Sequence, residues 1–148
     1  MVVCFLTFYN VKIVTHYWGL THYWVNYVKV LLERNDVNPN TAKKDDQTPV
    51  YGAAQEGHEG VVKMLLERND VNPNTANNYG QTPLFVAAWK GREGVLKAFL
   101  ERADVNPNTA NKSGLTPLYG AATEGHEGVV KMLLERNDVN PSTANEDG

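Results

Sequence analysis

The chain has 148 residues, of which 42% are apolar and 21% are charged, as is ordinary for a soluble globular protein. Its net charge of −3 argues against nucleic acid as a partner, because phosphate binding needs a basic face. Cys4 is the single cysteine, which excludes a disulfide within the chain and fits a reducing compartment.

Residues 1–27 form an irregular opening segment. Its apolar run, Val2 to Tyr9, has no basic residue before it and is far shorter than the ~20 residues that span a bilayer. We therefore expect neither a signal peptide nor a transmembrane helix. We predict an intracellular protein, in the cytoplasm or else in the nucleus. The segment is either a cap over the first layer or a degenerate repeat, which we favour because caps present a polar outer face.

From residue 28 onward the chain repeats itself every 34 residues. A six-residue block that begins Val-Asn-Pro recurs at residues 37–42, 71–76, 105–110 and 139–144. A Thr-Pro block followed by Ala-Ala begins at Thr48, Thr82 and Thr116. Such a period is typical of a solenoid, whose small units stack on one another. After a helix at residues 28–34, the predicted units lie near residues 48–81, 82–115 and 116–148.

The middle unit predicts two helices. Thr82 can cap the first helix with its hydroxyl, Pro83 fits the first helical position, and Gly91 can end the helix in a left-handed conformation. This predicts a helix over residues 82–90. A second helix over residues 93–102 would bury apolar residues that recur with each turn, namely Val95, Leu96, Phe99 and Leu100.

The second helix should end in a tight turn, followed by an extended loop rich in Asn, Pro and Gly. We expect Asn35, Asn69 and Asn137 to end it in the left-handed conformation, which Asn tolerates. Ala103 occupies this position in the middle unit. The sequence therefore predicts that Ala103→Gly stabilises the protein.

These motifs resemble the ankyrin repeat, in the sequence from Thr82 to Gly91, in "GHEGVVKMLLER" from Gly57 and Gly125, and in the recurring Asp-Val-Asn. The resemblance covers roughly residues 28–148. It implies an all-α solenoid of stacked helix-turn-helix units, with finger loops that project to form a concave face. The family usually has His where this chain has Tyr51, Phe85 and Tyr119, so we expect packing to replace part of a polar network.

No arrangement of residues predicts an enzyme, a metal site or a cofactor. His58 and His126 stand in Gly-His-Glu, but Arg92 replaces the histidine in the middle unit. We therefore interpret the two histidines as structural residues at the start of the second helix. The glycines that recur at Gly60, Gly94 and Gly128 predict close helix packing.

The resemblance implies partner binding through the finger tips and the exposed side of the first helix. On the finger tips, the residues at these positions are Lys44, Asp45, Gln47, Asn78, Tyr79, Gln81, Lys112, Ser113 and Leu115. On the first helices, they are Gln55, Glu56, Val86, Trp89, Lys90, Thr123 and Glu124.

Trp89 has two interpretations. It is either a binding anchor, as exposed aromatic residues often are, or a residue that packs against the next helix. In the first case Trp89→Ala abolishes partner binding and leaves the circular dichroism unchanged.

The leading functional prediction is a non-catalytic scaffold for protein–protein interaction, acting as a monomer or as part of a longer array. The alternative is a detached fragment of a larger signalling protein with no independent function. Residues 145–148 match residues 77–80 in phase, and the next Thr-Pro would follow them. We therefore expect the last apolar layer to be open on one side.

Overall fold

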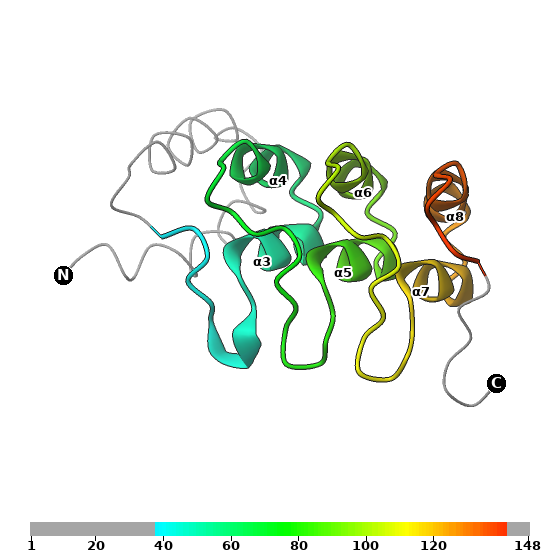
Figure 1. The fold of residues 1–148 in the computed structure, drawn as a ribbon, viewed down its shortest axis with the longest axis horizontal. Helices are drawn as coiled ribbons and strands as arrows, with labels where there is room; N and C mark the ends of the chain where they lie inside the picture. The colour runs from blue at the N-terminus through cyan, green and yellow to red at the C-terminus, as the bar shows by residue number, and fades with distance from the viewer. Residues whose placement is uncertain (1–37, 142–148) are drawn as a thin grey trace, which may run out of the picture.

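The computed structural model describes residues 38–141, which form two layers of helices joined by long loops (Figure 1). The first helices of successive units lie side by side in one layer: α3 (Pro49–Glu56), α5 (Pro83–Trp89) and α7 (Pro117–Thr123). The second helices form the other layer: α4 (Glu59–Leu66), α6 (Glu93–Leu100) and α8 (Glu127–Leu134). The predicted all-α stack of helix-turn-helix units is confirmed.

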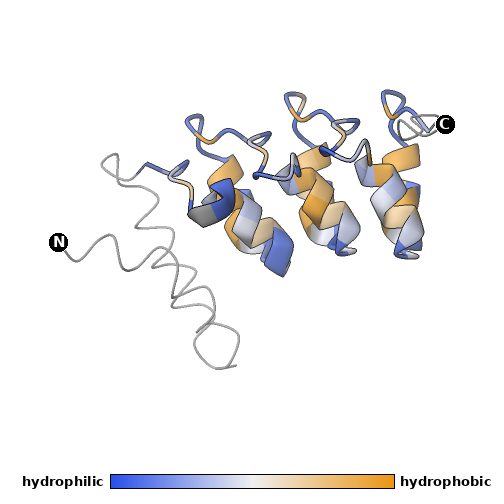
Figure 2. Cartoon of the chain, turned by 90° about the horizontal axis from the view of Figure 1, so that it is seen from below, coloured by the Kyte–Doolittle hydropathy of each residue, from blue (hydrophilic) through white to orange (hydrophobic). Residues whose placement is uncertain are grey.

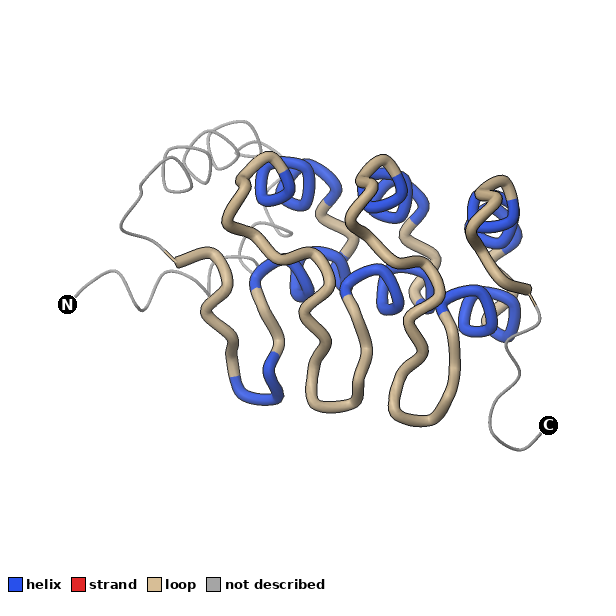
Figure 3. Tube along the Cα trace, viewed as in Figure 1, coloured by secondary structure: helices blue, strands red, loops and turns tan. Residues whose placement is uncertain are grey.

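Long loops project from the first layer as fingers (Figure 3). No strand is assigned within residues 38–141, and only the first finger carries a helical turn, the 3-10 turn η3 (Lys44–Asp46). The sequence expectations for residues 1–27, for the helix at 28–34 and for the turn at Asn35 lie outside the described residues.

The first helices begin and end where the sequence predicts. The Thr82 hydroxyl accepts a hydrogen bond from the Phe85 N–H at 3.1 Å, and Pro83 occupies the first turn. Gly91 follows with a φ of 67°, a left-handed conformation that glycine adopts without strain. The second helix ends at Leu100, two residues before the predicted end, because Glu101 and Arg102 already belong to the turn.

Hydrophobic residues concentrate on the helices, while the loops are mostly hydrophilic (Figure 2), and buried apolar side chains from both layers form one core. Ala87 and Ala88 on α5 are fully buried, and these small side chains allow the first helices to approach closely. Leu96 and Phe99 on α6 are also fully buried. Each unit therefore completes its core only against its neighbours, as expected of a solenoid.

The predicted left-handed turn after the second helix is wrong. Asn69 and Asn137 are not left-handed, because the only non-glycine residues with positive φ in residues 38–141 are Asp45 and Asp46 in the first finger. The turn after the second helix closes instead with right-handed backbone and a hydrogen bond from each arginine N–H to the helix, such as Arg102 N–H to Phe99 O at 3.1 Å.

The glycines at the start of the second helices do not all meet a neighbouring helix. A Cβ on Gly94 would collide with the Glu59 carboxylate, and one on Gly128 would collide with the Glu93 carboxylate. At Gly60 a Cβ would meet nothing within 4 Å among the residues that the structure describes. The close approach is therefore made by a glutamate side chain of the preceding unit.

Candidate functional site

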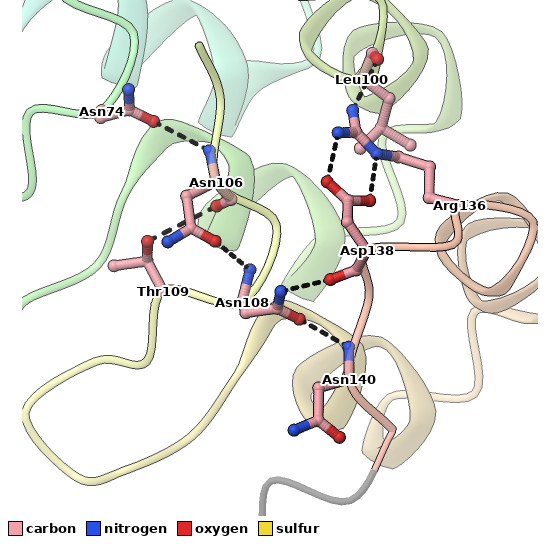
Figure 4. Close-up of polar contacts among 8 residues, drawn as sticks. All are labelled: Asn74, Leu100, Asn106, Asn108, Thr109, Arg136, Asp138 and Asn140. Atoms are coloured by element: carbon pink, nitrogen blue, oxygen red, sulfur yellow. Dashed lines mark hydrogen bonds and ion pairs between the residues drawn. The ribbon is translucent and has the colours of Figure 1, made fainter. Parts of the chain in front are cut away.

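A ladder of asparagine side chains joins the base of each finger to the next unit (Figure 4). The Asn108 amide Nδ2 donates to the Asp138 carbonyl at 2.6 Å, and its Oδ1 accepts from the Asn140 N–H at 2.8 Å. Asn40 and Asn74 make the same pair of bonds, each to the unit that follows. The sequence shows the repeated Asn but does not reveal these bonds. Their partners lie 30 and 32 residues away and are main-chain groups, which no particular side chain marks.

An arginine clamp joins the units on the other side of the turn. Arg136 donates through Nε and Nη2 to the Asp138 carboxylate at 2.8 and 2.6 Å, and through Nη1 to the Leu100 carbonyl at 2.8 Å. Arg102 binds Asp104 and the Leu66 carbonyl in the same way. The hydrogen bonds from Arg136 hold the pKa of Asp138 below its ordinary value, against a smaller opposing effect of desolvation.

The residues at the family's histidine position behave differently in different units. The Tyr51 hydroxyl donates to Gln81 Oε1 at 3.2 Å and accepts from Asn77 Nδ2 at 2.9 Å. At Tyr51 a polar network between α3 and the following finger is therefore retained. At Phe85 packing does replace it, because that ring is buried and stacks on Trp89 with the centroids 5.7 Å apart.

His126 and Arg92 bind the end of the first helix in the preceding unit. The His126 Nε2 lies 3.1 Å from the Trp89 carbonyl, and the Arg92 Nε donates to the Gln55 carbonyl at 3.3 Å. The structural interpretation of His126 is confirmed. Within residues 38–141 no group of three or more His, Cys, Asp or Glu side chains could hold a metal ion.

The predicted binding residues differ in accessibility. The side chains that are exposed are those of Asp45, Asn78, Tyr79, Lys112 and Ser113 on the fingers and Glu56, Lys90, Thr123 and Glu124 on the first helices. Gln47, Gln55, Gln81 and Leu115 are half-buried. Lys44 lies in η3. Gln81 is already engaged by the fold, since its Oε1 accepts from Tyr51 and Asn77.

Two residues on α5 are held in the interior of the stack. The prediction that Val86 lies on the exposed side of the first helix is wrong, since its side chain is only 6% exposed. Trp89 is half-buried, stacks on Phe85 and lies so close to α7 that a Cβ on Gly120 would be 2.8 Å from its ring. Trp89→Ala would therefore remove packing between units, whatever its effect on binding.

The comparisons agree with this geometry. A family model described as ankyrin repeats, in three copies, matches residues 22–109 and 79–145. Comparison with curated proteins gives no match. Among the described residues, none of the helices has the length and apolar character needed to cross a membrane. Because the family matches span well over half of its residues, the chain belongs to the ankyrin repeat family.

Proposed function

We propose that this chain binds a partner protein through the surface formed by its finger tips and first helices, without catalysing a reaction. Ankyrin repeats are generally protein–protein interaction modules, and the family is typically non-catalytic. The family resemblance implies that this surface is concave. Its candidate binding residues take part in neither the asparagine ladder nor the arginine clamps.

The observation that carries the proposal is the placement of Tyr79 at the tip of the second finger. Its side chain is 63% exposed. Its backbone is nevertheless fixed, because the Tyr79 N–H donates to Asn77 Oδ1 at 2.9 Å and its carbonyl accepts from the Lys112 N–H at 3.0 Å. An exposed aromatic ring on a fixed backbone loses little conformational entropy on binding, which is what an interface anchor requires.

The next finger supplies a matched control. Ser113 occupies the position of Tyr79 one repeat later, and its N–H makes the same bond to Asn111 Oδ1 at 2.9 Å. Serine is therefore compatible with this backbone, and Tyr79→Ser removes the ring without disturbing the finger.

We expect Tyr79→Ser to weaken partner binding by at least roughly tenfold, the loss typical of a truncated anchor residue. Partners would be captured with the 148-residue chain and their affinity measured by calorimetry. The melting temperature of the variant should stay unchanged, and Ser113→Ala should bind as the wild type does. An unchanged affinity in Tyr79→Ser would remove Tyr79 from the site.

The partner that we propose is a protein, and neither a nucleic acid nor a membrane. The net charge of −3 gives no general attraction for phosphate groups. The exposed fingers carry both signs of charge, at Asp45 and Lys112, together with the Tyr79 ring. We propose an intracellular setting, in keeping with the single cysteine.

A further inference from the structure

A pocket lies between α4 and α6, in the layer of helices away from the finger tips (Figure 1). The C-terminal ends of the two helices and the turns that follow them line it, with Lys63, Leu66, Glu67, Ala98, Glu101 and Arg102. Its volume is about 270 Å³. Sites for drug-sized ligands usually occupy about 300–1,000 Å³, so this pocket is of a size for one side chain.

The pocket lies where the middle unit has a small residue. Ala98 stands at the position that Met64 and Met132 take in the flanking units. One repeat later, in the groove between α6 and α8, Met132 packs against the core. Methionine is well suited to fill such irregular gaps, because its side chain is long, unbranched and flexible. The groove between α4 and α6 therefore lacks one side chain of this kind.

The charged groups around the pocket leave an excess of negative charge. Both cations already have partners, since Arg102 binds the carboxylate two residues further on and Lys63 donates to Glu59 Oε1 at 2.6 Å. Among the described residues, no hydrogen bond or ion pair engages the carboxylates of Glu67 and Glu101, and Glu101 has only a longer-range attraction to Lys63. Such carboxylates favour a basic group on a partner and disfavour an acidic one.

We propose that the pocket between α4 and α6 binds one long, unbranched apolar side chain, of the methionine type, from a partner protein segment in which Lys or Arg stands next to it. The apolar side chain occupies the space that Met132 fills one repeat later, between Leu66 and Ala98. The basic residue meets the carboxylates of Glu67 and Glu101. Because this surface belongs to the second helices, the proposal goes beyond the proposed function and does not depend on it.

The probe is the peptide Gly-Lys-Met-Lys-Gly, blocked at both ends, titrated into the 148-residue chain while the amide resonances of the protein are recorded. We expect saturable shifts at Leu66 and Ala98, with a Kd on the order of millimolar, because a single side chain supplies little binding energy. Alanine in place of the peptide's methionine should abolish these shifts. Glutamate in place of its lysines should weaken binding several-fold.

Ala98→Met closes the pocket, and the flanking units show that the fold accepts methionine at this position. We expect this variant to bind the probe at least roughly tenfold more weakly, with a melting temperature that is unchanged or higher because a cavity has been filled. Lys131→Met is the matched control, since it adds a methionine to the exposed side of α8 and should bind as the wild type does. Glu101→Gln should weaken binding several-fold at low salt.

Equal binding by the wild type and Ala98→Met would overturn the proposal, as would equal shifts from the methionine and alanine peptides. Absence of shifts at the pocket would overturn it as well. If Ala98→Met then also melts at a lower temperature, another part of this chain already fills the pocket. A probe that shifts only finger-tip residues such as Tyr79 would assign its binding to the surface of the proposed function.

Discussion

A single asparagine side chain joins two units through both atoms of its amide. Asn74 donates from Nδ2 to the Asp104 carbonyl at 2.7 Å and accepts at Oδ1 from the Asn106 N–H at 3.4 Å. The amide group offers a donor and an acceptor side by side, which matches one carbonyl and one N–H on an extended backbone. A carboxylate of the same shape could accept the N–H but would face the carbonyl with a second acceptor.

We expect Asn74→Ala to lower the free energy of unfolding by about 1–2 kcal/mol, because two hydrogen bonds between units are lost at a partly solvated site. Asn78→Ala is the control, since that exposed side chain lies at a finger tip. It should change stability by less than about 0.5 kcal/mol. Urea unfolding followed by circular dichroism measures both, and equal effects would contradict a role for the ladder.

The correction at the turn reverses the expectation for Ala103. Because none of Ala103, Asn69 and Asn137 has a positive φ, glycine relieves no strain there. It only adds conformational freedom to the unfolded chain. We therefore expect Ala103→Gly to destabilise the protein by about 0.4–1 kcal/mol. A higher melting temperature for the variant would contradict the backbone conformation of this turn.

At the scale of helices and fingers, two successive repeats carry different pairs of residues at the same two positions, one on the first helix and one on the finger after it. The interface between α3 and the second finger pairs Tyr51 with Gln81 through a hydrogen bond at 3.2 Å. One repeat later Phe85 and Leu115 take the same two positions, and neither has a polar group to satisfy. Each pair is therefore consistent within itself, polar with polar and apolar with apolar.

Burial raises the pKa of Tyr51, an effect that the hydrogen bond from Asn77 only partly offsets. The folded state thus disfavours the phenolate, so the stabilisation from Tyr51 is present below pH ~10, the ordinary tyrosine pKa, and is lost as the pH rises above it. We expect Tyr51→Phe to cost about 1 kcal/mol at pH 7 and to reduce the loss of stability between pH 9 and 11. Urea midpoints across this range would measure it, and parallel pH profiles would contradict it.

The sequence predicted the elements well because their signals are local. Thr82, Pro83 and Gly91 lie within one helix and define its ends through bonds and angles of that same segment. The ladder and the Tyr51 network could not be predicted in this way, because their partners lie about one repeat away and half of them are main-chain atoms. Val86 was misplaced because its position was carried over from the family resemblance, whereas its burial depends on how the neighbouring units approach in this chain.

At the scale of the whole stack, the arginine–aspartate pair of the clamp repeats once in each unit within residues 38–141. Arg68, Arg102 and Arg136 each bind an aspartate two residues later, with N–O distances between 2.6 and 2.8 Å. Hydrogen bonds from these arginines lower the pKa values of Asp70, Asp104 and Asp138. The stabilisation is therefore present above pH ~4, the ordinary aspartate pKa, and is lost as the pH falls below it.

We expect the melting temperature to fall between pH 5 and pH 2, in part through the three clamps. Asp104→Asn should melt at a lower temperature than the wild type at pH 7, because the charge-assisted pair to Arg102 is lost. The difference between the two proteins should shrink as the pH approaches 2, where the wild-type aspartate is protonated as well. Calorimetric scans at several pH values measure this difference in melting temperature. A constant difference would show that the Arg102–Asp104 pair makes no pH-dependent contribution to stability.

The choice of main-chain partners by the ladder and the clamps has a consequence for how such a chain can evolve. Asn74 and Arg102 bind carbonyl and N–H groups, which almost every residue provides, so their partners survive nearly any substitution. A unit moved by recombination to another place in the array therefore meets bonding groups that it already matches. The near-identity of residues 51–73 and 119–141, on either side of a divergent middle unit, fits an origin by such shuffling.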